Sequence, residues 1–388
     1  MSIYLDNSAT TKISEEALAK YNEVSKSIYG NPSSLHAMGL MAQKELDAAR
    51  NSLLLSLSDK TSSVIFTASG SEANNLAIIG RALSKERYRR GARIITTEGE
   101  HASVDSPLDK LAAMGFEVVK IPTRGGTIDL QALKEAMTKT VILVTLMHVN
   151  NETGALYDVA SAAKIMRACS PEAILHVDAT QSYLKIPFTK KSLGADMITV
   201  SSHKIEGPKG VGALVVDKEV IKSKGLSALI LGGGQEMGLR SGTENVPAVA
   251  AFSEAVRIGY ATLSERKRIC EELKAYLEER LSSDEFSSIS VTRPPVSAPH
   301  IINITLPGIK SETMLHFLSA SGIYVSSGSA CSSNSSHLSS ALIAYGRSAD
   351  EADFSIRISF SHNNKKSDVD AFCNTLSEGL SRLARTKR

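Results

Sequence analysis

The chain has 388 residues, of which 42% are hydrophobic and 22% are charged, and its formal net charge is +3 at pH 7. These values are ordinary for a soluble globular protein with ample core, and the length suggests two or three domains. The charge provides no basic surplus for nucleic acid, and no apolar run approaches the roughly 18 residues that span a membrane. We therefore expect neither nucleic acid nor a membrane as a partner.

The N-terminus and the cysteines indicate the compartment. Residues 1–6 lack the charged and apolar regions of a signal peptide. The four cysteines lie far apart with no Cys-x-x-Cys pair, so neither a disulfide framework nor a zinc site is indicated. We expect a cytoplasmic, reducing location and no metal site.

Short apolar runs alternate with helix-like stretches from about residue 60 to residue 216. The runs expected to form strands are 64–67, 93–96, 117–121, 141–147, 174–177, 197–200 and 212–216. Several are continuously apolar, which is typical of strands covered on both faces. This alternation predicts an α/β domain with a mainly parallel sheet, whose ligands collect at the carboxyl ends of the strands.

The pattern changes after Val246 and Pro247. Residues 264–281 have the apolar spacing of one amphipathic helix. Residues 301–304 and 355–358 alternate as in a half-exposed antiparallel sheet. We expect a large domain at 15–255 and a smaller α+β domain at 1–14 and 256–388, which carries a Ser-rich loop at about 326–340.

Lys204 follows the apolar run 197–200 directly, in the sequence Ser-Ser-His-Lys, with Gly-Pro-Lys-Gly behind it. A lysine at a strand exit, surrounded by hydroxyl, imidazole and glycine, is poorly explained as a solvated surface charge. It is well explained as an amine that forms a Schiff base with an aldehyde cofactor. Lys209 is the alternative for this role. It lies inside a glycine-flanked turn, so the end of the strand does not orient its side chain.

Other strand exits also carry polar side chains. Asn151 comes shortly after the run 141–147, and Asp178 and Gln181 follow the run 174–177. A lone carboxylate there is usually a helix N-cap. Its functional role would be to keep the ring nitrogen of pyridoxal phosphate protonated, and pairing with Lys204 favours that interpretation of Asp178.

A phosphate would bind to backbone amides and hydroxyls at a helix start. Gly70 and Ser71, between the run 64–67 and the helical stretch 73–83, supply such a start. Gly-Ser turns before helices are common, so the signal is moderate on its own. The Gly-x-Gly-x-x-Gly fingerprint of dinucleotide sites and the Walker pattern are both absent.

Two further side chains have alternative interpretations. His101 could stack on a cofactor ring or move protons, although lone histidines are more often structural. Arg357 alternates with Ile356 and Ile358, so it would point away from them. Its guanidinium could bind a carboxylate bidentately, although a strand arginine is usually just exposed.

Cys331 differs from the other cysteines because its neighbours are serines, glycine and alanine. Most free cysteines are buried hydrophobes, which suits Cys270 and Cys373, and Cys169 beside a proline is expected to be inert. Cys331 instead lies in a segment with the composition of a mobile loop. An accessible thiol on such a loop is suited to react.

The chain resembles the cysteine desulfurases of nitrogen fixation and iron–sulfur-cluster assembly, which are fold-type-I pyridoxal-phosphate enzymes of the class-V aminotransferase family. The likeness runs nearly end to end and is specific as an ordered set. The stretches that carry it are 4–11, 30–34, 147–154, 176–182, 201–210, 240–243, 326–331 and Arg357. The resemblance implies a large domain with a seven-stranded sheet flanked by helices, plus a smaller α+β domain.

The resemblance also implies a role for each matching residue. Lys204 matches the Schiff-base lysine, Asp178 the partner of the pyridine nitrogen, His101 the ring-stacking histidine, and Gln181 the hydrogen bond to the phenolic oxygen. Gly70, Ser71, Ser201 and His203 match the phosphate site, to which Thr243 is added by the second subunit of a homodimer. Asn151 and Arg357 match the substrate-carboxylate contacts, and Cys331 matches the nucleophile that takes sulfur as a persulfide.

The implied reaction converts L-cysteine to L-alanine and passes the sulfur to an acceptor protein, such as an iron–sulfur scaffold. A selenocysteine lyase or an aminotransferase on the same scaffold is the alternative. A non-catalytic scaffold protein is disfavoured, because Lys204, Asp178 and Cys331 are all present.

Three departures from the family pattern stand out. Glu206 occupies a position that is commonly aromatic, and Leu231 one that is often histidine. The Ser-rich loop after Cys331 lacks the Leu-Glu-Pro that is common there. The chemistry survives these changes, but the identity of the acceptor does not follow from the sequence.

Overall fold

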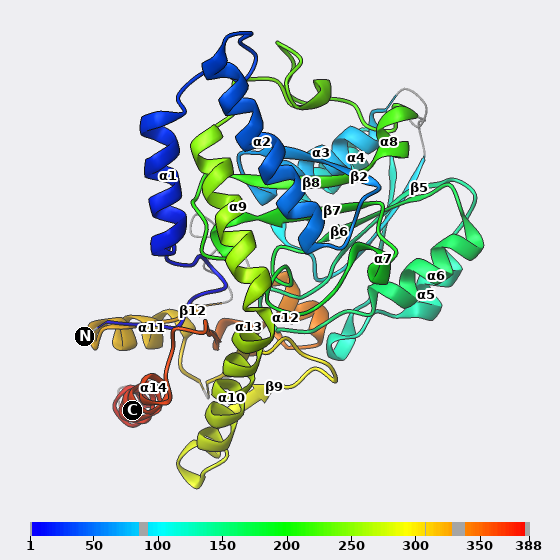
Figure 1. Ribbon diagram of the computed structural model, residues 1–388. Helices are drawn as coiled ribbons and strands as arrows, with labels where there is room; N and C mark the ends of the chain where they lie inside the picture. The colour runs from blue at the N-terminus through cyan, green and yellow to red at the C-terminus, as the bar shows by residue number, and fades with distance from the viewer. Residues whose placement is uncertain (1, 85–91, 307, 328–337, 385–388) are drawn as a thin grey trace.

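The computed structural model describes residues 2–84, 92–306, 308–327 and 338–384. Its main feature is a seven-stranded sheet, of which Figure 1 labels β2, β5, β6, β7 and β8. The strand order is β2-β8-β7-β6-β5-β3-β4. The strands are β2 (Ser62–Thr67), β3 (Arg93–Thr97), β4 (Glu117–Ile121), β5 (Val141–Met147), β6 (Ile174–Asp178), β7 (Met197–Ser201) and β8 (Gly212–Asp217). All seven predicted strands are confirmed. The sheet is mainly parallel, and β8 runs antiparallel to both of its neighbours.

Helices cover both faces of this sheet, which is why several of its strands are continuously apolar. All seven residues of β5 are buried. Along β2 the side chains alternate, since Val64 and Phe66 belong to one core cluster and Ile65 to another. The first cluster includes residues of α1 (Glu15–Ser27), α2 (Ala37–Ser56), α5 (Leu130–Ala136), α6 (Val159–Cys169), α7 (Lys190–Leu193) and α9 (Val246–Ala261). The second includes residues of α3 (Gly70–Ala82), α4 (Ala102–Ala113) and α8 (Lys218–Lys222).

A smaller antiparallel sheet has the order β12-β13-β10-β9. Its strands are β9 (Ser290–Thr292), β10 (Ile301–Thr305), β12 (Ser326–Ser327) and β13 (Ser355–Ser359). The antiparallel pairing confirms the prediction for 301–304 and 355–358. The expectation of a half-exposed sheet was wrong, because every residue of β10 and β13 is buried.

The two faces of the smaller sheet are covered in different ways, one by an apolar core and the other by polar contacts with the large sheet. Ile302, Ile304, Ile356 and Ile358 pack into a third core cluster with α10 (Leu263–Leu281), which confirms the predicted helix. Residues of α11 (Ser311–Ala320) and α14 (Lys366–Ala384) complete that cluster. The opposite face is polar, and its Arg357 contacts the loop after β5 of the large sheet. The short helices α12 (Ser340–Tyr345) and α13 (Ala349–Asp353) precede β13.

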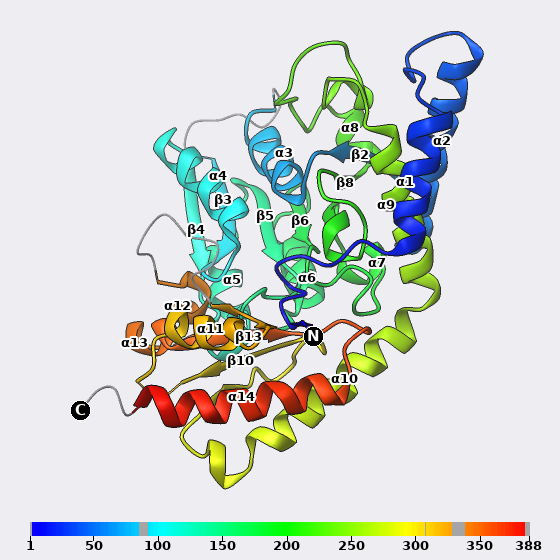
Figure 2. The same cartoon turned by 90° about the vertical axis from the view of Figure 1, so that its left-hand side faces the viewer.

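The N-terminal segment connects the two sheets. Its strand β1 (Ile3–Tyr4) pairs in parallel with β11 (Ile323–Tyr324), and Leu5 packs in the core beside the smaller sheet. Figure 2 shows the segment crossing from there towards α1. The backbone N–H of Thr11 donates to the carbonyl of His203 at 2.9 Å, next to the end of β7. The domain boundaries at residues 15 and 256 stay a prediction.

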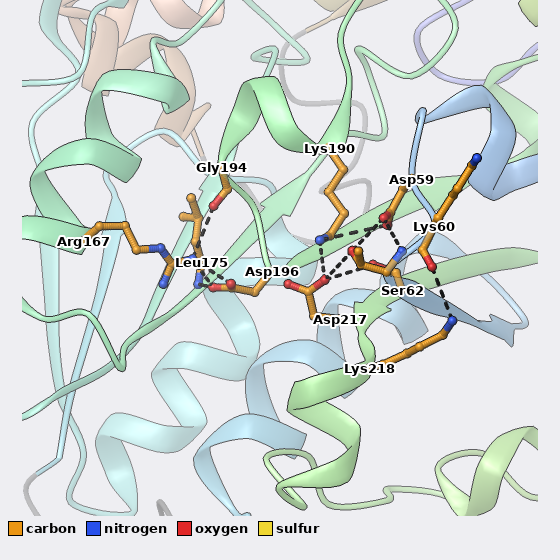
Figure 3. A network of polar contacts seen from close by, with 11 residues as sticks. Asp59, Lys60, Ser62, Arg167, Leu175, Lys190, Gly194, Asp196, Asp217 and Lys218 are labelled. Atoms are coloured by element: carbon orange, nitrogen blue, oxygen red, sulfur yellow. Dashed lines mark hydrogen bonds and ion pairs between the residues drawn. The ribbon is translucent and has the colours of Figure 1, made fainter.

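Ion pairs fix the end of the large sheet where the parallel strands begin (Figure 3). Lys190 Nζ lies 2.5 Å from Asp217 Oδ1, at the end of the antiparallel strand β8. Asp196 precedes β7, lies 2.6 Å from Arg167 and accepts the N–H of Leu175 in β6. The charged pairs of this network lie at the amino ends of the parallel strands. They therefore do not occupy the carboxyl ends, where a ligand would bind. None of the helices in the described ranges is long and apolar enough to cross a membrane.

Candidate functional site

A cavity of about 250 Å³ opens at the carboxyl ends of the parallel strands. Ten of the twelve predicted site residues line it, and they are Gly70, Ser71, His101, Asn151, Asp178, Gln181, Ser201, His203, Lys204 and Arg357. Thr243 lies elsewhere on an exposed loop, and Cys331 lies outside the described residues. The sheet edge therefore gathers most of the residues that the sequence singled out.

Lys204 reaches the cavity from a short 3₁₀ turn, Ser202–Lys204, that directly follows β7. Its Nζ donates hydrogen bonds to the carbonyl oxygens of Ser8 at 2.6 Å and Ala9 at 2.8 Å. Both acceptors belong to the N-terminal segment, which thus positions the amine. Lys209 is exposed and does not line this cavity.

Asp178 ends β6 and is 6% exposed. Its Oδ2 accepts a hydrogen bond from Asn74 Nδ2 at 2.8 Å, and its Oδ1 accepts the N–H of Thr180 at 2.9 Å. Two neutral donors therefore hold the carboxylate in place without neutralising it. The charge remains for a cationic group of a ligand in the cavity.

His101 is the N-cap of α4, where its Nδ1 accepts the N–H of Ser103 at 3.1 Å. The hydroxyl of Ser103 also lies 2.8 Å from this nitrogen, and it accepts a hydrogen bond from Asn74. Burial lowers the pKa of His101 below its ordinary value, which favours the neutral ring. Since Nδ1 accepts, the proton of the neutral ring belongs on Nε2.

The N-terminus of α3 forms another wall of the cavity. Gly70 permits a close approach there, because a Cβ atom would lie tightly at 3.2 Å from Ser201 Cβ and 3.3 Å from Thr180 Oγ1. Ser201 Oγ is buried and has no hydrogen-bond partner among the described residues. Burial, with Lys204 nearby, lowers the pKa of His203 to about 4, so the ring is neutral. Backbone amides at a helix start and such hydroxyls suit a phosphate.

Arg357 approaches the cavity from the smaller sheet. It is only 6% exposed, so the expectation of an ordinary exposed strand arginine does not hold. Its Nη1 donates to the carbonyl of Asn151 at 2.8 Å, and its Nη2 lies 2.9 Å from Asp6 Oδ1. Its Nε is buried and has no partner within the described ranges. Since no group in the described ranges accepts the Nε–H, it is available for a ligand in the cavity.

Several residues at the site were missed by the sequence reasoning. Asn74 donates hydrogen bonds to Asp178 and Ser103, and Asp6 accepts a hydrogen bond from Arg357. Asn74 lies one helical turn after Gly70, and that spacing was the signal that could have found it. Asp6 gave no such signal, because it reaches the site only through long-range folding of the N-terminal segment. Gln181 Nε2 donates to the carbonyl of Ser8 at 2.9 Å, which adds a further contact with that segment.

Glu206, which departs from the family pattern, is a buried structural link. It has a positive φ of 67° and is 7% exposed. Its carboxylate lies 3.1 Å from Arg266 Nη1 and accepts a hydrogen bond from Asn363 Nδ2 at 3.1 Å. The position thus joins the segment after Lys204 to α10 by charge rather than by an aromatic ring. Leu231, the other departure, is 82% exposed.

Comparison with known proteins agrees with this geometry. The model of the class-V aminotransferase family matches residues 3–372. The chain belongs to the class-V aminotransferase family. It is 38% identical to a NifS/IcsS protein homolog of Lactobacillus delbrueckii subsp. bulgaricus, with 95% of both chains covered. It is 35% identical to cysteine desulfurase IscS 1 of Archaeoglobus fulgidus, with 98% of this chain and 97% of the relative covered. The solved structure of a NifS-like protein superposes with a TM-score of 0.90 at 33% identity, covering 98% of this chain and 100% of the other.

Members of this family use pyridoxal phosphate, and the residues present fit that cofactor. The buried Ser201 Oγ and Asn74 Oδ1 have no partner among the residues that the structure describes, so both can form hydrogen bonds with a ligand. Gly70 and Ser71 at the start of α3 line the cavity, where backbone amides suit a phosphate. Lys204 and Asp178 supply the amine and the carboxylate that the aldehyde and the ring nitrogen require.

Glu100, directly before His101, makes the stability of the folded chain depend on pH. It is fully buried, where its Oε1 accepts the hydroxyl of Thr97 and the N–H of Met147, and burial raises its pKa to about 8. Protonated Glu100 therefore contributes stability that is fully present below the ordinary carboxyl pKa. That contribution is lost as the pH rises through about 8.

We expect Glu100→Gln to remove this loss. Between about pH 5 and about pH 9, the wild type should lose roughly 2 to 4 kcal/mol of unfolding free energy relative to the variant. Denaturant unfolding at both pH values measures the difference. Glu98→Gln, a change at an exposed neighbour, is the control and should follow the wild type. An identical pH dependence in the wild type and Glu100→Gln would refute the expectation.

Proposed function

We propose that the chain is a pyridoxal-phosphate-dependent cysteine desulfurase, which converts L-cysteine to L-alanine and passes the sulfur on as a persulfide of Cys331. The observation that carries the proposal is the convergence of Lys204, Asp178 and Arg357 on one cavity. An amine, an anion and a carboxylate-binding cation are what an amino-acid enzyme of this cofactor class needs. The printed names of its relatives support the same activity.

Each end of the cavity suits one end of the cofactor. The phosphate would lie at the start of α3, against Gly70, Ser71, Ser201 and His203. The ring would lie beside His101, with its nitrogen at Asp178, and Gln181 would donate to the phenolic oxygen. Bound in this way, pyridoxal phosphate supplies an electron sink for the α-carbon of the substrate.

The chain's own residues then bind the substrate and move its protons. Arg357 would hold the substrate carboxylate through its unpartnered Nε–H, with Asn151 beside it. The Lys204 amine would take the α-proton, because its position next to the cavity is fixed by Ser8 and Ala9. His101, with its proton on Nε2, would exchange protons with groups on the side of the cavity where the cofactor ring would lie.

Sulfur transfer would fall to Cys331. The Cys331 thiolate attacks the substrate sulfur, a sulfur–sulfur bond forms, and the carbon–sulfur bond of the substrate breaks. The electron pair of that bond stays on carbon, which takes up a proton and becomes the methyl group of alanine. The products are alanine and a persulfide on Cys331, so atoms and electrons balance.

The chain on either side of residues 328–337 supports this role. Ser326 pairs in register with Arg357, and Ser339 donates a hydrogen bond to Glu152, beside Asn151. Both described ends thus adjoin the substrate side of the cavity. Cys331 is four residues beyond Ser327, and an extended chain of that length spans about 14 Å.

A homodimer would complete the phosphate site. Thr243 lies on an exposed loop outside the cavity, and the same stretch of chain carries Leu231, 82% exposed, and Met237, 51% exposed. Exposed apolar side chains of this kind favour an interface. Thr243 of one subunit would then contact the phosphate held by the other.

The remaining proposals concern the surroundings of the enzyme. The sulfur would pass to an acceptor protein for iron–sulfur clusters or thio-cofactors. The three cysteines that the structure describes, Cys169, Cys270 and Cys373, are free thiols, which suits a reducing cytoplasm. The separate cores of the two sheets support a large domain at 15–255 and a small domain formed by the rest.

Lys204→Ala should abolish covalent attachment of the cofactor. Borohydride reduction followed by denaturation should leave the cofactor on the wild-type chain and release it from the variant, as measured by intact mass. Lys209→Ala, which removes the exposed rival, should retain it. Cofactor attached to the Lys204→Ala chain would assign the linkage to another lysine.

Cys331→Ser should bind the cofactor normally but form alanine from L-cysteine more than about a hundredfold more slowly, because the nucleophile is lost. Alanine production and cofactor absorbance measure the two properties. Cys169→Ser is the matched control and should keep the wild-type rate. Full activity of Cys331→Ser would exclude the desulfurase mechanism, and a keto acid as the product would indicate an aminotransferase.

A further inference from the structure

A second, smaller cavity lies behind Lys204. It has a volume of about 40 Å³, and Lys204 lines both it and the large cavity. Its other polar lining residues include Lys185, Cys270, Glu206, Arg266 and His300. A water needs about 10 to 15 Å³ of such volume, so the space holds more than one water or a small ion.

Two buried side chains at this cavity lack the partners that they need. Lys185 Nζ is buried and makes no hydrogen bond with the described residues. His300 is 1% exposed, and neither of its ring nitrogens has a partner in the same part of the chain. Buried polar groups without partners are rare, and an unpaired buried ammonium costs several kcal/mol. Both side chains therefore indicate a missing ligand.

The charge around the cavity is mainly positive. Lys185, Lys204 and Arg266 line it, and Glu206 is the only carboxylate among the described lining residues. That carboxylate is already engaged with Arg266 and Asn363. Cys270 is a neutral thiol, since burial raises its pKa to about 11. The surplus is positive, so an anion rather than a cation would be stabilised.

We propose that this cavity is a binding site for a small monovalent anion of the size of chloride or hydrosulfide. The anion accepts hydrogen bonds from Lys185 Nζ and from a ring N–H of His300. It neutralises a charge that the chain leaves unpaired. A water in the same place would satisfy the hydrogen bonds but not the charge.

The site has two consequences for its surroundings. Burial, with the positive charge of Lys204 nearby, lowers the pKa of Lys185 to about 7, and an anion beside it would favour the charged form. An occupant would also lie beside Lys204, which lines this cavity and which we propose as the proton acceptor. Hydrosulfide is released when a thiol reductant reduces the persulfide on Cys331, so a species derived from the proposed product has the right size and charge. The site does not rest on that activity, because chloride serves equally.

Bromide is the probe that tests the site. Crystals of the cofactor-loaded protein soaked in bromide should show an anomalous peak between Lys185 and His300. In solution, bromide should raise the melting temperature relative to gluconate at equal ionic strength, because gluconate is too large for the cavity. Addition of hydrosulfide at the same ionic strength should displace bromide if the reaction product is the physiological occupant, and chloride is the occupant if it does not.

Lys185→Met isolates the charge. The variant removes an unpaired buried ammonium and should fold, but it should lose the anomalous peak and bind bromide at least about tenfold more weakly. Lys267→Met removes one charge from the exposed side of α10 and should behave like the wild type. The proposal fails if the wild type shows no bromide peak, or if all three proteins gain the same stability from bromide.

Discussion

The parallel strands of the large sheet end at one edge, and the chemistry of this chain depends on what that edge collects. Asp178 ends β6 and Lys204 follows β7, so two neighbouring strands deliver a carboxylate and an amine to one cavity. Ion pairs such as Lys190 with Asp217 fix the opposite end of the sheet. The rigid sheet therefore sets the separation of the reactive groups, and loops only refine it.

The N-terminal segment supplies the second constraint. It contributes carbonyl oxygens to Lys204, a carbonyl oxygen to Gln181 and the carboxylate of Asp6 to Arg357. Burial raises the pKa of Asp6, and Arg357 opposes this change. The segment thus couples the smaller sheet to the large one at the point where the substrate carboxylate would bind. A shift of either sheet would disturb the amine and the guanidinium together.

Much of this arrangement could be predicted from the sequence because its causes are local. Short apolar runs between helix-like stretches identified all seven strands, and several of these runs are continuously apolar because both faces of the strand are covered. Nine of the ten predicted cavity residues follow those runs, and Arg357 lies on a strand of the smaller sheet instead. The role of each residue came from the family resemblance rather than from the spacing.

The rest depends on contacts between distant parts of the chain. Arg357 was predicted to bind the substrate carboxylate, but the sequence does not reveal that the loop after β5 and Asp6 cover it. Glu206 looked like a loss of an aromatic contact, whereas α10 provides Arg266 to receive its charge. Thr243 and Cys331 depend on a second subunit and on residues 328–337 respectively, and both roles stay predictions.

The central claim is that Lys204 and Cys331 act in one reaction on L-cysteine. A single turnover without reductant or acceptor tests it most directly, with alanine quantified and the chain mapped by tandem mass spectrometry. The account predicts equal amounts of alanine and of chain carrying one additional sulfur atom on Cys331. Alanine formed without that sulfur, or sulfur found on Cys169, Cys270 or Cys373 instead, would contradict it.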